Sequence, residues 1–228
     1  MSCVVVTGAS QGIGAAIAAA FAESTDLPIA LVARTQSNLD RVADQTRGVT
    51  FSCDVTRGDA VSAMAQEVIT RFGAPAVLVN NAGRFVPGSI MDTDTSAFMD
   101  QLEVNLVSGY MVTRAFLPAM LEQGAGHLFF MGSVASIKAY PGAAAYCAAK
   151  HGLLGLARCL RQETKSAGLR VTTLMPGATL TPSWDGSQLP PSRLMDAADI
   201  AQTVVDIWHL SDRTVVEGIV LRPQEGDI

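Results

Sequence analysis

Tyr146 and Lys150 are the two residues whose types and spacing most clearly indicate chemistry. They are four positions apart, so on a helix their side chains lie on one face, one turn from each other. A nearby ammonium stabilises a phenolate and lowers the pKa of the phenol, which allows proton transfer near neutral pH. The pair therefore predicts a general acid that protonates a carbonyl oxygen, with Lys150 as the group that tunes it.

A glycine run near the N-terminus predicts a nucleotide site. The run has the spacing G-x-x-x-G-x-G and directly follows the apolar stretch 3–6. Backbone N–H groups at the start of the next helix would hold a pyrophosphate, and the glycines would allow its close approach. A tight structural turn is the alternative for the run taken alone. The contacts expected here are Gly8, Ser10, Gln11, Gly12, Ile13 and Gly14.

The end of the second predicted strand indicates which dinucleotide binds. An acidic residue at this position would hydrogen-bond the adenosine ribose of NAD. The sequence instead has Ala33 followed by Arg34, and a guanidinium can bind a 2′-phosphate with two hydrogen bonds. Together with Ser10 in the glycine run, Arg34 predicts NADP(H) as the cofactor. The alternative for Arg34 is a solvated surface arginine.

Polar residues also follow the third and fourth predicted strands, at the sheet edge where open α/β folds bind ligands. Asp54 could accept a hydrogen bond from the adenine amino group. The pair Asn80–Asn81 could bind the cofactor or clamp neighbouring strands, and the sequence leaves both roles open. The contacts expected at this edge are Asp54, Val55, Asn81, Ala82 and Gly83.

Strands and helices that alternate along the chain must position these residues. Apolar, β-branched runs predict strands at 3–6, 28–33, 49–53, 76–79, 127–131, 169–175 and 217–221. Helical periodicity predicts helices at 15–23, 36–45, 59–72, 96–122, 144–167 and 197–210, with a kink or break at Pro118. The order predicts one doubly wound, Rossmann-type α/β domain over residues 1–228. Its seven-stranded sheet should be mostly parallel, with helices on both faces.

Composition and charge exclude several classes of protein. The net charge is −5, and the sequence has no lysine or arginine run suited to nucleic acid. No apolar stretch reaches the roughly 20 residues that span a bilayer, and no signal segment precedes the glycine run, so we expect a cytoplasmic protein. The four cysteines lack metal-ligand spacing, so we expect free, buried thiols and no metal.

Taken together, the motifs resemble those of the short-chain dehydrogenase/reductase family. The family's motifs are matched, in order, by Thr7–Gly14, Asn80–Gly83, Asn105, Ser133, Tyr146–Lys150 and Pro176–Gly177. The resemblance implies that Ser133 holds the substrate oxygen and that Asn105 helps hold a water linked to Lys150. It also implies that Lys150 binds the nicotinamide ribose. Taken singly, Ser133 could instead be a cap and Asn105 a helix bend.

The resemblance also completes the expected cofactor site and active site. The implied catalytic residues are Asn105, Ser133, Tyr146 and Lys150, and the further cofactor contacts are Tyr146, Lys150, Pro176, Gly177, Thr179 and Thr181. The expected substrate wall is mostly apolar and consists of Phe85, Val86, Val134, Tyr140, Leu180 and Trp184. Arg84 or Lys138 at its rim could admit a negative group, although surface charge is the simpler interpretation.

These residues predict an NADP(H)-dependent oxidoreductase that reduces a small apolar ketone, aldehyde or dicarbonyl, or oxidises the matching alcohol. One alternative is a reductase of 3-oxoacyl chains or of pterins such as sepiapterin. Another is a catalytically silent nucleotide sensor, which the complete tetrad disfavours. We also expect a homodimer or homotetramer, because the helices at 96–122 and 144–167 would expose apolar surface in a monomer.

Overall fold

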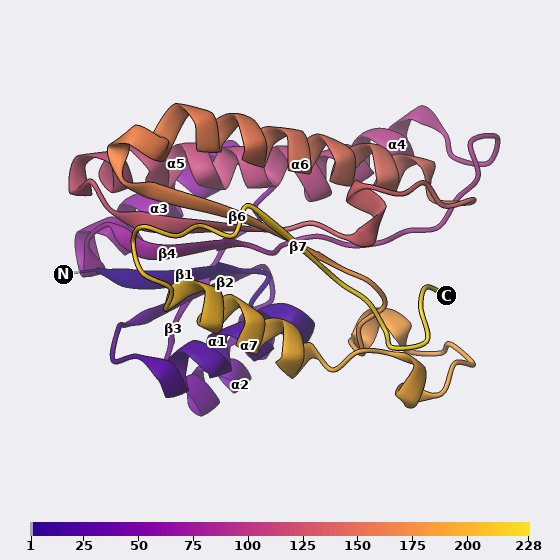
Figure 1. Ribbon diagram of the computed structural model, residues 1–228, viewed down its shortest axis with the longest axis horizontal. Coiled ribbons are helices and arrows are strands. Elements are labelled where there is room, and N and C mark those ends of the chain that lie inside the picture. The colour runs from indigo at the N-terminus through magenta and orange to yellow at the C-terminus, as the bar shows by residue number, and fades with distance from the viewer. Residues whose placement is uncertain (1) are drawn as a thin grey trace.

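The computed structural model describes residues 2–228 of the chain, and its centre is one seven-stranded sheet (Figure 1). The strand order is β3-β2-β1-β4-β5-β6-β7, and every neighbouring pair is parallel. Val5 in the middle of β1 pairs with Ala30 of β2 and Leu78 of β4. The strands are β1 (Cys3–Thr7), β2 (Ile29–Ala33), β3 (Val49–Ser52), β4 (Pro75–Asn80), β5 (Gly126–Met131), β6 (Leu169–Pro176) and β7 (Gly218–Leu221). The predicted fold class is confirmed.

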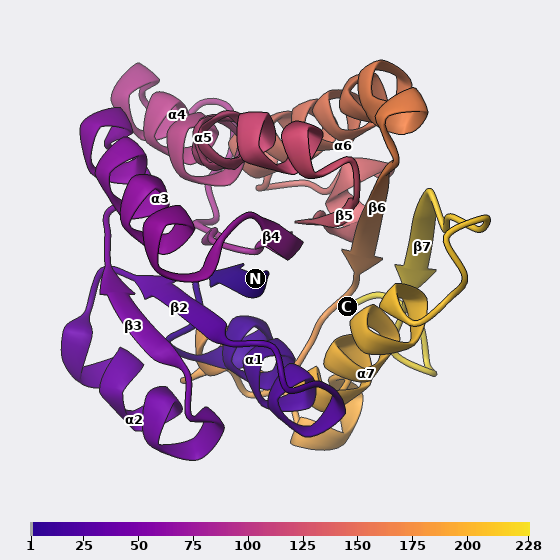
Figure 2. The same ribbon diagram turned by 90° about the vertical axis from the view of Figure 1, so that its left-hand side faces the viewer.

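Helices cover both faces of the sheet, and each side has its own apolar core (Figure 2). Phe116 is fully buried in the core under α3, α5 and α6, and Phe21 in the core under α1, α2 and α7. The α-helices are α1 (Gly12–Ser24), α2 (Gln36–Thr46), α3 (Gly58–Phe72), α4 (Thr95–Leu102), α5 (Ser108–Gln123), α6 (Ala144–Thr164) and α7 (Ala197–Trp208). Burial on both faces explains why β1 and β4 are continuous apolar runs.

The long helix expected at 96–122 is interrupted at residues 103–107 and not at Pro118, where a kink or break was predicted. Helix α5 continues through Pro118, whereas a π-helical turn at Glu103–Val107 separates α4 from α5. Asn105 lies in this turn and is buried. Single π turns inside α-helices occur frequently at functional sites, because the extra residue changes the direction of one side chain. The helix expected at 144–167 ends at Thr164 and is followed by a short 3₁₀ turn, Lys165–Ala167.

The loops that follow the strands gather at the right of Figure 1, where the C-terminal segment also ends. Helix α6 begins at this edge and carries Tyr146 in its first turn. Within residues 2–228, no helix is long and apolar enough to cross a membrane, and no group of ligand side chains could hold a metal ion. The prediction of buried thiols was wrong for Cys159, which is exposed on α6, whereas Cys3, Cys53 and Cys147 are buried.

Candidate active site

Tyr146 and Lys150 lie on the same face of α6, as their spacing predicts. The ammonium nitrogen of Lys150 is 5.6 Å from the centre of the Tyr146 ring. Lys150 is buried, and its Nζ donates a hydrogen bond to the carbonyl oxygen of Met131 at the end of β5, at 2.8 Å. Burial lowers the pKa of Lys150 to about 8, because the charged form loses its hydration. The lysine can therefore release a proton near neutral pH.

The pKa of Tyr146 differs from the prediction. Burial raises it above the ordinary value for tyrosine, and a hydrogen bond with Ser133 opposes that rise. The lowering expected from Lys150 was wrong, because desolvation of the phenol dominates and the ammonium donates its hydrogen bond to the Met131 carbonyl. The raised pKa keeps the phenol of Tyr146 protonated, as a general acid requires.

Ser133 is both a cap and a partner of the tyrosine. Its Oγ accepts a hydrogen bond from the backbone N–H of Ala135 at 3.1 Å, and Ser136 Oγ accepts one from the N–H of Ser133. This capping box begins the 3₁₀ turn Val134–Ser136 after β5. A hydroxyl that accepts from an amide still has its own proton to donate. The capping role and a catalytic role for Ser133 are therefore compatible.

Asn105 clamps the loop after β4 to the π turn. Its Oδ1 accepts from the backbone N–H of Arg84 at 3.0 Å, and its Nδ2 donates to the Arg84 carbonyl at 2.9 Å and to Gln101. Gly83 lies so close that a Cβ there would stand 2.7 Å from Asn105 Oδ1 and 3.5 Å from Lys150 Nζ. The side chain of Asn105 is thus held entirely by protein partners.

The glycine run is tied directly to the end of β4. Thr7 Oγ1 accepts hydrogen bonds from the N–H groups of Asn81 and Ala82, and the Asn81 amide donates to the carbonyls of Thr7 and Gly8. The structure thus shows the clamping role for Asn81, while Asn80 donates from its buried amide to Thr113. Helix α1 begins at this turn without a side-chain cap, so its first N–H groups are available to a phosphate.

The segment after β6 covers the glycine turn. Thr179 is buried and donates to the Gly177 carbonyl, and Pro176 pairs with Leu221 of β7. The methyl group of Thr181 lies over Gly12, 3.1 Å from where a Cβ would stand. Thr181 therefore lies beside the first turn of α1, where a pyrophosphate would bind.

A second arginine, which the sequence did not indicate, contacts the glycine turn. Arg34 is exposed at the end of β2, as predicted. Arg41 of α2 extends its Nη2 to 3.5 Å from the Ser10 carbonyl oxygen, which the sequence analysis missed. The sequence signal that could have found this contact is the position of Arg41 on the predicted helix 36–45, seven residues after Arg34. Asp54 accepts two hydrogen bonds from Thr56, which lower its pKa below the usual value.

The residues expected to form the substrate wall are only partly together. The half-exposed Phe85 packs edge-on against Tyr146, with ring centres 5.2 Å apart, and Val86 is similarly exposed. Leu180 is also half-exposed, and Trp184 lies in the short 3₁₀ turn Pro182–Trp184. Two other expected wall residues offer less surface: Val134 is buried, and the hydroxyl of Tyr140 is bonded to Asp227.

The fold and the tyrosine–lysine site define a Rossmann-type oxidoreductase. A family model described as short chain dehydrogenase matches residues 2–189. A sepiapterin reductase of Chlorobaculum tepidum is 33% identical over 99% of this chain and 97% of its own length. The chain belongs to the short-chain dehydrogenase/reductase family, which confirms the predicted family and enzyme class.

Solved structures agree with this assignment. An alcohol dehydrogenase from the archaeon Thermococcus sibiricus, complexed with 5-hydroxy-NADP, has a TM-score of 0.91 and 28% identity, with 100% of this chain and 99% of that chain covered. A metagenomic short-chain oxidoreductase in complex with NADP has a TM-score of 0.86 and 30% identity, with 98% and 97% covered.

The buried ammonium predicts a specific pH dependence of stability. Because the pKa of Lys150 is about 8 in the folded protein and near that of free lysine when unfolded, folding releases a proton between these values. The free energy of unfolding of the wild type should therefore rise relative to Lys150→Met above pH 8, by at most about 1.4 kcal/mol per pH unit. Urea unfolding from pH 7 to 10 measures this difference. The exposed Lys165→Met is the control, and parallel curves for wild type and Lys150→Met would contradict the burial argument.

Proposed function

We propose that the protein is an NADP(H)-dependent reductase of small, largely apolar ketones, aldehydes or dicarbonyls, or a dehydrogenase of the corresponding alcohols. The observation that carries this proposal is the shared face of α6, where a buried Lys150 lies beside a protonated, half-buried Tyr146. A protein that only senses nucleotides has no need of a buried cation beside a phenol, since burying the cation costs free energy.

The residues around the glycine turn fit a dinucleotide. The first N–H groups of α1 lack a side-chain cap, and a Cβ on Gly14 would strike the Gly8 carbonyl, so the turn is kept close to the sheet. When bound, the nicotinamide cofactor supplies or accepts the hydride. In this proposal Lys150 also holds the nicotinamide ribose. Pro176, Gly177 and Thr179 form one wall around the nicotinamide end, and Thr181 contacts the cofactor beside the first turn of α1.

Each side chain of the tetrad has a defined role in the proposed reaction. Tyr146 donates its proton to the substrate oxygen, and Ser133 stabilises the negative charge that develops on that oxygen. Lys150 returns a proton toward Tyr146, for which a pKa of about 8 is well suited. Asn105 is a positioning residue, because its side chain holds the loop that contains Gly83 against the lysine.

NADP(H) rather than NAD(H) is supported by charge at the glycine turn. Arg41 places a guanidinium beside Ser10, and β2 is followed by Arg34 rather than by an acidic residue. A 2′-phosphate would bind such a pair through charge-assisted hydrogen bonds. Two similar solved structures, one in complex with NADP and one with 5-hydroxy-NADP, support the same choice.

The sepiapterin reductase of Chlorobaculum tepidum, similar over nearly all of this chain, favours a pterin as the second candidate substrate class. A panel that contains apolar ketones, dicarbonyls, 3-oxoacyl thioesters and sepiapterin, followed by NADPH absorbance, would distinguish these classes. A homo-oligomer stays a prediction, and the exposed Val107, Tyr110 and Leu121 along the 103–123 helical segment are consistent with it.

Tyr146→Phe should lower kcat by about 10²- to 10⁴-fold, because the substrate oxygen loses its proton donor. Affinity for NADPH should stay within about twofold of the wild type, since the ring and Lys150 remain. Stopped assays and quenching of tryptophan fluorescence measure the two quantities. Tyr110→Phe, the same change at an exposed position of α5, is the control. Full turnover by Tyr146→Phe would refute its role as the acid.

Arg34→Gln and Arg41→Gln should each lower kcat/KM for NADPH by about tenfold, the value of one charge-assisted hydrogen bond. Values for NADH should change little, because NADH carries no 2′-phosphate. The ratio of the two kcat/KM values is the measurement. Arg71→Gln, at the far end of α3, is the control. An unchanged ratio in both variants would exclude these arginines from phosphate recognition.

A further inference from the structure

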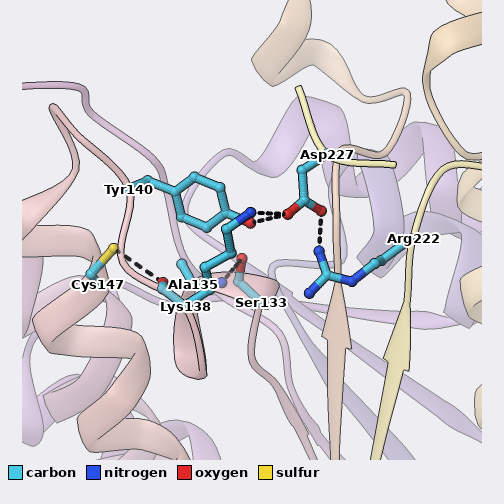
Figure 3. Close-up of polar contacts among 7 residues, drawn as sticks. All are labelled: Ser133, Ala135, Lys138, Tyr140, Cys147, Arg222 and Asp227. Atoms are coloured by element: carbon cyan, nitrogen blue, oxygen red, sulfur yellow. Dashed lines mark hydrogen bonds and ion pairs between the residues drawn. The ribbon is translucent and has the colours of Figure 1, made fainter. Parts of the chain in front are cut away.

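A carboxylate is held by three donors next to the active site. Asp227 Oδ2 accepts hydrogen bonds from Lys138 Nζ at 2.7 Å and from the Tyr140 hydroxyl at 2.8 Å, and Oδ1 accepts one from Arg222 (Figure 3). The two cations hold the pKa of Asp227 well below its usual range. Lys138 and Tyr140 lie 89 and 87 residues before Asp227, so only the tertiary fold brings these groups together.

This cluster belongs to the same loop as the catalytic serine. Lys138 and Tyr140 lie between Ser133 and Tyr146 in the chain, and Figure 3 shows Ser133 beside them. Tyr140 and Tyr146 pack against the same small apolar cluster, which consists of Ala135, Ala143 and Cys147. A group bound at Lys138 and Arg222 is therefore a neighbour of the reacting centre.

The charges of the cluster are unbalanced. Lys138 and Arg222 contribute two positive charges, and Asp227 contributes the only carboxylate that bonds them among residues 2–228. Arg222 also lines an open cleft of about 500 Å³ with residues 192–196, 199, 221 and 223–225, a volume typical of a ligand site. Arg222 is therefore the member of the cluster that borders this open cleft.

We propose that Lys138, Tyr140 and Arg222 form an anion subsite that binds the carboxylate of the substrate, and that Asp227 occupies this subsite when substrate is absent. The proposal rests on the proposed function and narrows it to carbonyl compounds with an apolar body and a carboxylate end. A substrate carboxylate can replace Asp227 group for group, because it offers the same two acceptor oxygens in the same plane. Asp227 then acts as an internal competitor.

The first test compares keto acids with their own methyl esters. A series with two to six methylene groups between ketone and carboxylate varies the separation of the two ends. For each length, the ratio of kcat/KM for acid over ester is measured with wild type and Asp227→Asn. At one or more lengths we expect the ratio to rise about five- to tenfold in Asp227→Asn, because the competing charge is removed. An unchanged ratio at every length would overturn the proposal.

The second test removes the cations. Lys138→Gln and Arg222→Gln should each lower the acid-to-ester ratio about fivefold, in the background of Asp227→Asn. Arg193→Gln is the control, because Arg193 lines the cleft but bonds only to Glu225. If acid and ester fall in parallel, the cluster merely stabilises the loop, and the subsite is refuted.

A binding measurement separates this inference from the function on which it rests. Benzoate carries a carboxylate but no reducible carbonyl, so its affinity does not depend on turnover. Calorimetric titration should show at least about fivefold tighter binding of benzoate to Asp227→Asn than to the wild type, and loss of that gain in the double variant with Arg222→Gln. If no ketone is reduced but benzoate behaves in this way, the proposed function fails and the subsite stands. Equal weak binding to all three proteins would overturn the subsite alone.

Discussion

A buried ammonium with no carboxylate partner is the constraint on which the rest of this active site depends. Lys150 is almost inaccessible to solvent, and within residues 2–228 it forms no salt bridge, only a hydrogen bond to the Met131 carbonyl. Burial of an unpaired charge is costly, so the surrounding fold must compensate for it. This burial lowers the pKa of Lys150, and the lowered pKa allows the lysine to donate and accept a proton near neutral pH.

Several backbone features of the carboxyl edge follow from the need to enclose this lysine. The loop after β4 approaches Asn105 so closely that a Cβ at position 83 would lie 2.7 Å from Asn105 Oδ1, with Lys150 Nζ at 3.5 Å. Asn105 fixes that loop through two hydrogen bonds to the Arg84 backbone and is itself held by two to Gln101, while the π turn sets its orientation. The last residue of β5, Met131, supplies the carbonyl that accepts the hydrogen bond of the ammonium. Ser133 follows two residues later in the chain. The tetrad is therefore one packed unit rather than four independent residues.

The sequence predicted the sheet, the helix positions and the shared face of Tyr146 and Lys150, because these depend on local periodicity and on spacing along one helix. It failed where distant segments decide the outcome. The π turn at 103–107 contains a side chain that bonds the loop at Arg84, and Pro118 was a misleading local signal. The pKa of Tyr146 follows from tertiary burial. Asp227 meets partners nearly 90 residues away, so no local pattern could place it.

The central claim is that burial keeps Tyr146 protonated as the general acid, and that the positive charge of a bound NADP⁺ would lower its pKa. The chain has only three tyrosines, so ¹³C labelling at tyrosine Cζ, with Tyr146→Phe for assignment, resolves each phenol by NMR. A pH titration with and without NADP⁺ is the most direct measurement. The account predicts a pKa for Tyr146 above that of free tyrosine in the protein alone, and below it with NADP⁺ bound. A pKa that stays raised with NADP⁺ bound would contradict the account.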